Sequence, residues 1–178
     1  MPIDRHDAQV LDFSPEHGNE TSFVTVPLPC GSRRWHCAWT HPAQEYRAEL
    51  DLTGKGFRVF LPLHLDRRFE RHAGHANVVP LFPGYLFVQF STAQDQWRRI
   101  YRARGIAGLI GEATERPTPV PEGVVEDLLE RTSPRRIVDD PGSTAFQSPH
   151  HQRAHWQSIT SLSAEARNSL LLRLFGRT

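Results

Sequence analysis

The chain has 178 residues, a formal net charge of +1 and an apolar fraction of 38%. This length fits one domain of ordinary size with extensions, and the near-neutral charge excludes a uniformly basic nucleic-acid-binding protein. Two cysteines are too few for a disulfide framework, and no apolar run reaches the roughly 18 residues of a membrane span. We therefore expect a cytoplasmic protein with no membrane contact.

The first part of the chain divides at about residue 33. Residues 1–32 are polar, proline-bearing and aperiodic, which predicts a disordered N-terminal arm. Residues 34–40 are rich in aromatic side chains and partly alternating, which predicts a first strand. Trp35, Cys37 and Trp39 are expected on one side of this strand, because alternate residues share a face.

A helix is expected next, opened by Pro42 at the first helical position. Residues 57–63 then predict a second strand, and the polar, arginine-rich and histidine-rich residues 64–77 predict an exposed hairpin arm. The apolar residues of the helix recur at helical spacing and are expected to face the core: Ala43, Tyr46 and Leu50.

The longest apolar run in the chain covers residues 79–90. Pro80 and Pro83 cannot donate to a strand ladder, so pairing should begin near Gly84. From there the side chains alternate between two faces, and both faces carry large apolar groups. One face is expected to be core, and the other must be covered by a helix or serve as a docking surface. The expected core residues are Leu86, Val88 and Phe90.

The rest of the chain predicts two more helices and a strand. Ser91 and Gln94 have the spacing of a capping box before a helix that places Trp97, Ile100 and Tyr101 on one side. A short strand at 106–110 and a helix at 122–131 follow. The order of these elements predicts an α+β fold over residues 33–132, a mainly antiparallel four-stranded sheet flanked by helices. Residues 133–157 are predicted to be a linker.

No set of residues points to catalysis. His72 with His75, and His150 with His151 and His155, lack cysteine or carboxylate partners at zinc spacing. No nucleophile–base pair and no phosphate-binding loop is visible. We therefore expect no catalytic residue, no metal and no cofactor, and we interpret the chain as a non-enzymatic binding protein.

Residues 84–90 resemble the aromatic central strand of RNA-recognition domains. That resemblance implies an RNA-binding module in which Tyr85 and Phe87 form a base-stacking platform. This interpretation is the alternative to the one that follows.

A second resemblance covers residues 33–132. It consists of Trp35, the run 80–88 with the sequence PLFPGYLFV, Trp97, the glycine-containing residues 104–111 and the proline-rich residues 116–121, in order and at matching spacing. These motifs resemble the N-terminal (NGN) domain of NusG transcription factors, and the 80–88 run is especially similar to the operon-specialised RfaH branch.

The NusG resemblance implies a transcription elongation and antitermination factor that binds the clamp helices of the β′ subunit of bacterial RNA polymerase and suppresses pausing. Aromatic anchors on a rigid sheet suit such an interface. By their match to the family motif, the implied polymerase-binding residues are Trp39, Phe82, Pro83, Tyr85 and Phe87.

The same resemblance implies a contact with the exposed non-template DNA strand, through which such a factor would be operon-specific. His41, Arg47 and Arg104 occupy the matching positions. Arginine at such a site contacts phosphate or stacks on a base.

The tail at 158–178 resembles the later part of the family's KOW domain in a degenerate, truncated form. A β-barrel that lacks strands cannot close its edges, which argues against recruitment of Rho or a ribosomal protein. The tail fits a strand or a helix equally well by periodicity. A helical tail is expected to fold over the aromatic groove through Leu171, Leu174 and Phe175, and the other expectation is a disordered tail.

Overall fold

The computed structural model describes residues 32–66, 77–138 and 159–176. The predicted N-terminal arm, apart from Ser32, most of the predicted hairpin arm and most of the predicted linker lie outside these residues. The described elements are, in chain order, β1 (Arg34–Thr40), α1 (Glu45–Gly54), β2 (Arg58–Phe60), β3 (Leu63–Asp66), β4 (Asn77–Pro80), β5 (Tyr85–Phe90), the 3-10 helix η2 (Trp97–Arg102), β6 (Ile106–Leu109), β7 (Gly111–Ala113), β8 (Arg116–Pro117), α3 (Val124–Glu130), the 3-10 turn η5 (Ile159–Ser161) and α4 (Ala164–Arg173).

The main sheet has four strands in the order β2-β5-β1-β6. Every neighbouring pair in it is antiparallel. The two central strands, β1 and β5, pair from Arg34 opposite Phe90 to Trp39 opposite Tyr85. Two small hairpins, β3-β4 and β7-β8, complete the described strands. The predicted α+β class and its antiparallel four-stranded sheet are confirmed.

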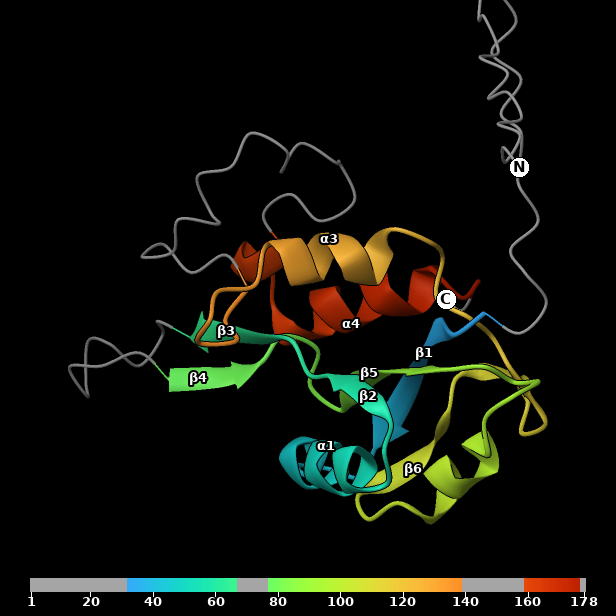
Figure 1. Ribbon diagram of the computed structural model, residues 1–178. Coiled ribbons are helices and arrows are strands. Elements are labelled where there is room, and N and C mark those ends of the chain that lie inside the picture. Colours follow the sequence, from blue (N-terminus) through green and yellow to red (C-terminus); the bar gives the residue numbers. More distant parts are fainter. Residues whose placement is uncertain (1–31, 67–76, 139–158, 177–178) are drawn as a thin grey trace, which may run out of the picture.

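Helices cover both faces of this sheet (Figure 1). Helices α3 and α4 lie next to each other over one face, whereas α1 and η2 lie on the other. Each face has its own apolar cluster, because neighbouring residues of a strand point to opposite faces. The residues predicted to be core, Leu86, Val88 and Phe90, are fully buried on the α1 side.

The predicted inward face of the first helix is wrong. The helix begins at Glu45 rather than at Pro42, and Tyr46 and Leu50 are 48% and 77% exposed. Its buried residues are Glu45, Ala48 and Leu52. The reason is a long-range hydrogen bond: the Gly84 amide donates to Glu45 Oε1 at 2.7 Å, so a carboxylate takes the inward position. No local pattern of hydrophobicity reveals such a contact.

The predicted strand over 57–63 is two strands. β2 joins the main sheet beside β5, and β3 pairs with β4 in the separate hairpin. Pro62 lies between them, and a proline cannot donate to a ladder. Its carbonyl accepts a hydrogen bond from the Leu81 amide at 2.8 Å, which ties the end of β4 to this break.

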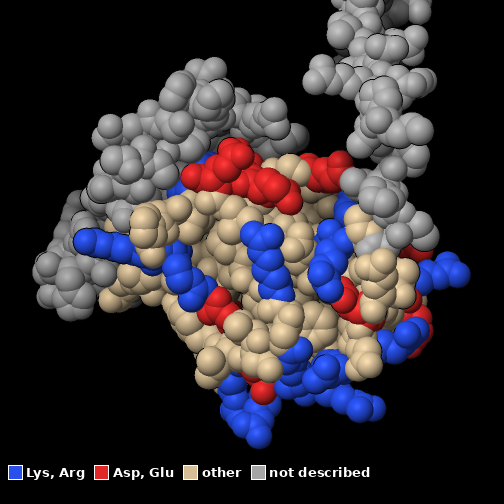
Figure 2. All heavy atoms as spheres, viewed as in Figure 1, with Lys and Arg blue, Asp and Glu red and all other residues tan. Residues whose placement is uncertain are grey.

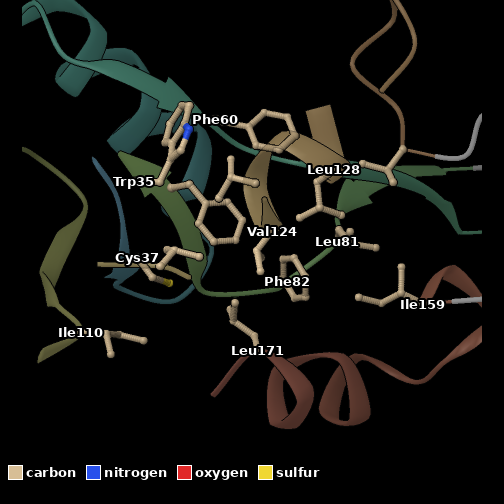
Figure 3. Close-up of a cluster of buried hydrophobic side chains, with 14 residues drawn as sticks. Trp35, Cys37, Phe60, Leu81, Phe82, Ile110, Val124, Leu128, Ile159 and Leu171 are labelled. Atoms are coloured by element: carbon tan, nitrogen blue, oxygen red, sulfur yellow. The ribbon is translucent and has the colours of Figure 1, made fainter. Parts of the chain in front are cut away.

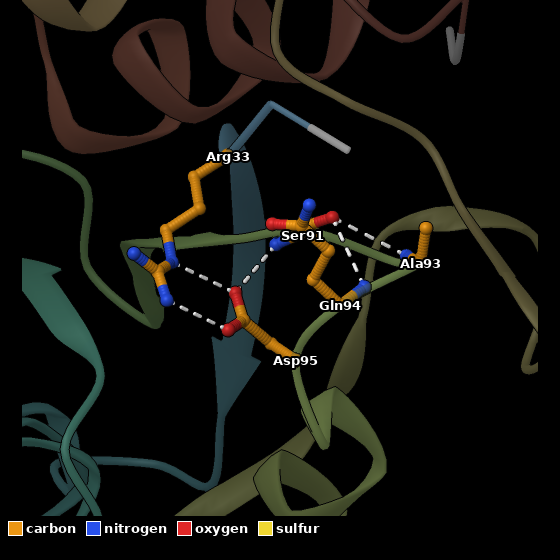
Figure 4. Close-up of polar contacts among 5 residues, drawn as sticks. All are labelled: Arg33, Ser91, Ala93, Gln94 and Asp95. Carbon is orange, nitrogen blue, oxygen red and sulfur yellow. Dashed lines mark hydrogen bonds and ion pairs between the residues drawn. The ribbon is translucent and has the colours of Figure 1, made fainter. Parts of the chain in front are cut away.

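The predicted capping box at Ser91 is half right (Figure 4). Ser91 Oγ accepts hydrogen bonds from the amides of Ala93 and Gln94 at 3.3 and 3.2 Å. The reciprocal bond comes from Asp95, whose Oδ2 accepts from the Ser91 amide at 2.8 Å. Asp95 also receives two bonds from Arg33, which hold the pKa of its carboxyl below the ordinary value. The helix behind this turn is the 3-10 helix η2.

The first residues of the predicted linker pack onto the domain. Ile137 and Val138 are buried, and they form isolated bridges with Leu63 and Thr132, respectively. Beyond the undescribed residues 139–158, the tail forms a helix. Ser163 caps α4, because its side chain accepts from the Ala166 amide at 3.2 Å. No helix in the described ranges is long and apolar enough to cross a membrane.

Candidate functional site

The five residues that the sequence assigns to polymerase binding converge on the α3–α4 side of the sheet. Trp39 is the penultimate residue of β1 and the cross-strand partner of Tyr85, the first residue of β5. Phe82 precedes β5 and packs edge-on against Phe87, with ring centroids 6.0 Å apart. Pro83 lies between Phe82 and the turn residue Gly84, whose φ is +85°. We call this set of five residues the aromatic face.

The residues of the aromatic face differ greatly in exposure. Phe82 and Phe87 have relative exposures of 0% and 1%, whereas Trp39 is 47% exposed. Pro83 and Tyr85 are half-buried. Trp39 is therefore the member of this face that solvent reaches most freely, and the two phenylalanines lie beneath other parts of the chain.

The tail helix is part of what covers them (Figure 3). Leu171 of α4 and Ile159 of η5 are fully buried in the same cluster as Phe82 and Phe87. Val124 and Leu128 of α3 line the cluster from the neighbouring helix. Of the two expectations for the tail, the helical cover is the one the structure contains. Further tail residues pack against the cluster while partly buried: Leu170, Leu172, Leu174 and Phe175.

A buried arginine fixes the tail to the domain. Arg167 of α4 is 3% exposed. Its Nε donates to the Leu81 carbonyl at 2.6 Å, and one terminal nitrogen donates to the Leu162 carbonyl at 2.6 Å. The other terminal nitrogen lies 3.0 Å from His64 Nε2. Because a guanidinium only donates, His64 Nε2 is the acceptor and carries no proton in this arrangement.

A second polar contact fixes the tail directly over the aromatic face. Asn168 Nδ2 donates to the Pro83 carbonyl at 2.9 Å. Sequence reasoning missed the polar role of Arg167 and Asn168. The sequence contains a weak indication of this role. If the tail is taken as a helix capped by Ser163, then Arg167 and Asn168 lie on the same side of it as Leu171.

The position of Trp39 depends on a glycine in the neighbouring strand. Trp39 and Gly108 are cross-strand partners. A Cβ built on Gly108 would lie 2.4 Å from the indole Nε1 of Trp39, closer than two such atoms can approach. The absence of a side chain at Gly108 therefore lets the indole lie against β6 while its other surface faces solvent.

The three residues assigned to nucleic acid lie elsewhere, at the α1 side of the molecule. Arg47 and Arg104 are exposed and line one shallow hollow of about 410 Å³, together with Leu50, Asp51 and Lys55. The Arg104 amide donates to Asp51 Oδ2 at 3.0 Å, which holds the turn before β6 against α1. His41 lies beside this turn, because its amide donates to the Gly105 carbonyl at 2.9 Å. Its side chain is exposed, but it does not line the hollow.

Cys37 is enclosed in the aromatic-side cluster. Burial raises the pKa of this thiol, so it does not supply a thiolate near neutral pH. Within residues 32–66, 77–138 and 159–176, no group of three or more histidine, cysteine, aspartate or glutamate side chains is placed to hold a metal ion. The histidine groups singled out in the sequence, at 72–75 and 150–155, lie outside these ranges.

The geometry thus describes a class of binding domain: an antiparallel sheet that presents aromatic residues on one side and exposed arginines on the other. Comparison with known proteins gives the family. The model of the transcription termination factor NusG family matches residues 33–129. This match covers more than half of the chain, so the chain belongs to the NusG family, and the resemblance seen in the sequence is confirmed.

The relatives found by sequence are distant. The chain is 24% identical over 108 residues to a transcription termination/antitermination protein NusG of Halalkalibacterium halodurans, a match that covers 54% of this chain and 61% of that protein. It is 23% identical over 121 residues to the NusG of Staphylococcus aureus strain Mu50, covering 61% of this chain and 66% of the relative. The chain therefore matches less than two thirds of the length of these curated relatives.

Among solved structures, one titled "Domain interaction in Thermotoga maritima NusG" matches with a TM-score of 0.38 and 18% sequence identity. The match covers 55% of this chain and 54% of that one.

Proposed function

We propose that this chain is a transcription elongation and antitermination factor that binds the clamp helices of the β′ subunit of RNA polymerase and suppresses pausing. The observation that carries the proposal is the aromatic face, five residues gathered on a rigid sheet in a chain of the NusG family. Large aromatic side chains in a desolvated pocket supply most of the binding energy of an interface. A cytoplasmic location, where such a polymerase works, is part of this proposal.

In the free protein the tail would compete with this partner. Leu171 and Ile159 occupy the cluster that contains Phe82 and Phe87, so clamp helices gain access to both rings only when α4 leaves. The proposal therefore includes autoinhibition by α4. The division of the chain at residues 132 and 157, and the kinship of residues 158–178 with a KOW domain, stay predictions.

The nucleic-acid part of the proposal concerns the hollow between α1 and the turn before β6. Two exposed guanidinium groups, Arg47 and Arg104, line it, and arginine is well suited to bind phosphate. We assign the non-template DNA strand of the elongation complex to this hollow, with His41 at its border. Simultaneous contact with the clamp and this strand would hold the clamp closed.

The test uses Trp39, because an exposed side chain can be changed without unfolding the core. Binding of the full chain to an isolated clamp-helix coiled coil is measured by calorimetry, with no nucleic acid present. We expect Trp39→Ala to weaken binding by at least about 10-fold, the loss of about 1.4 kcal/mol or more that an interface hot spot gives. The matched control is Leu50→Ala. Leu50 is an apolar residue of α1 that is 77% exposed, and its replacement should leave the affinity unchanged.

Equal affinities of the wild type, Trp39→Ala and Leu50→Ala proteins would reject the aromatic face as the polymerase site. The RNA-binding alternative predicts something different: tight binding to free single-stranded RNA that is lost in Tyr85→Ala. Phe87, the second member of the supposed stacking platform, has a relative exposure of 1%, so no base can stack on it while α4 is docked.

A further inference from the structure

A second basic hollow lies beside the first, and the proposed nucleic-acid surface does not include it. It has a volume of about 480 Å³ and lies where the end of α1, strand β2 and the turn before η2 meet. Four basic side chains and one carboxylate line it, with three glutamine side chains between them. The basic residues are Arg33, Lys55, Arg58 and Arg99, and the carboxylate belongs to Asp95.

The charges of this hollow are only partly neutralised. Asp95 is already bound by Arg33, and Lys55 pairs with Asp51. Within the described part of the chain, Arg58 and Arg99 form no ion pair with a carboxylate, and both are exposed. Arg58 is also oriented, because its guanidinium carbon lies 5.2 Å from the centroid of the Trp35 ring. Arg58 Nη1 also donates to Gln89 Oε1 at 3.4 Å. The hollow therefore presents two guanidinium groups whose charge no carboxylate of the described residues neutralises.

Lys55, the only lysine of the chain, joins the two hollows. It lines the hollow of Arg47 and Arg104 as well as that of Arg58 and Arg99. Figure 2 shows the wider setting: basic side chains gather along the lower edge of the molecule, over α1 and η2, whereas acidic side chains gather over α3. Lys55 thus places the two hollows next to each other at the C-terminal end of α1.

We infer that the two hollows form one track for a single nucleic-acid strand, whose sugar–phosphate backbone passes from Arg47 and Arg104, around Lys55, to Arg58 and Arg99. This inference rests on the proposed nucleic-acid surface and extends it. From Arg47 to Lys55 the helix rises about 12 Å at about 1.5 Å per residue, a distance that a strand of a few nucleotides spans. The second hollow therefore serves the nucleotides beyond that length.

A nucleic-acid backbone fits this surface better than an acidic peptide does. Protein interfaces rely on buried apolar or aromatic anchors, and the lining of the second hollow is dominated by arginine, lysine and glutamine. Guanidinium groups bind phosphate through paired donors, and amide side chains accept and donate to base edges without requiring one sequence. The track therefore adds affinity and strand length rather than sequence choice.

The experiment compares two strand lengths. Binding of the full chain to single-stranded DNA of about four and about 16 nucleotides, the range of common single-strand site sizes, is followed by fluorescence anisotropy over a salt series. We expect Arg58→Gln with Arg99→Gln to leave the short strand unaffected. On the long strand the double variant should lower the salt-dependence slope by about 1.4, the loss of two phosphate contacts at about 0.7 each. Arg116→Gln with Arg135→Gln is the charge-matched control, since both arginines are exposed elsewhere.

The variant Arg47→Gln with Arg104→Gln separates binding at the first hollow from binding along the whole track. If it weakens both strands while Arg58→Gln with Arg99→Gln behaves like the control pair, the track is wrong and the first hollow stands. If neither pair differs from the control, the proposed nucleic-acid surface fails as well. Binding of polyglutamate with the affinity of the long strand, lost in Arg58→Gln with Arg99→Gln, would overturn the inference in favour of an acidic protein partner.

Discussion

His36 is a buried ionisable residue whose surroundings favour the neutral form. It is 3% exposed and stacks on Phe90 with ring centroids 3.9 Å apart. Its Nδ1 lies 3.0 Å from the Arg34 carbonyl, to which a protonated Nδ1 donates. Burial is the main cause that lowers the pKa of His36 from 6.5 to about 4, against a smaller opposite effect of the Arg34 hydrogen bond.

This lowered pKa makes stability depend on pH. Between pH 6.5 and 4 the unfolded chain takes up a proton at His36 and the folded chain does not, so the free energy of unfolding falls as the pH falls. The loss should approach about 3 kcal/mol by pH 4. His36→Phe keeps the stacking and removes the titration, and we expect its urea midpoint to change less between pH 7 and 4.5 than that of the wild type. Parallel curves for the two proteins would show that His36 does not titrate in this window.

At the scale of single elements, α4 is held by apolar contacts on one side and by Arg167 at its centre. Replacing Arg167 by Met keeps much of the volume and removes three hydrogen bonds, which leaves the buried carbonyl of Leu81 and the partly buried carbonyl of Leu162 without this donor. We expect α4 docking to weaken by about 2–4 kcal/mol, seen as faster hydrogen exchange in residues 164–173. The rest of the domain should keep its exchange rates.

The control for this prediction is Arg173→Met, on the exposed part of the same helix. It changes the same chemical groups without a buried partner. Similar exchange rates in Arg167→Met and Arg173→Met would mean that the buried guanidinium does not hold the helix. The His64 contact gives an independent measurement, because a nitrogen chemical shift of His64 Nε2 should report loss of the Arg167 donor.

The sequence predicts elements best where their residues have a strong local pattern. Strand β5 was predictable from alternation and from Gly84, and α3 from Val124, Val125 and Leu128. The orientation of α1 was not, because Glu45 is inward only through its bond with Gly84. The motifs name the five residues of the aromatic face, which the fold brings to one side of the sheet, but they do not choose between a helical and a disordered tail. What decides that choice is long-range: Arg167 bonds a residue 86 positions away.

At the scale of the whole molecule, residues of the aromatic face and of the tail share one core, and the proposal requires the tail helix to leave it when the partner binds. Leu171 is completely buried against that core, whereas Leu162 is 40% exposed at the start of the tail. We expect Leu171→Asp to release α4, because a carboxylate cannot stay ionised in an apolar cluster. Release should strengthen binding to the clamp-helix coiled coil about tenfold for each 1.4 kcal/mol of docking free energy removed.

Leu162→Asp is the control of equal charge, and it should bind like the wild type. Circular dichroism of both variants verifies that the sheet is intact. Leu171→Asp could keep the sheet and show fast hydrogen exchange in the tail, yet bind the coiled coil with unchanged affinity. In that case α4 is a structural part of the domain and not an inhibitor of this site.

The covering helix belongs to the same chain as the surface it covers, and the 25 residues 139–163 separate it from Val138. If α4 inhibits this site as proposed, it acts as a tethered ligand, whose effective concentration is set by the connection and not by the amount of protein. Dilution does not expose Phe82 and Phe87, and a higher protein concentration does not hide them further. A partner must instead outcompete a fixed intramolecular equilibrium, so the fraction of open molecules is a constant of the sequence at a given temperature and pH.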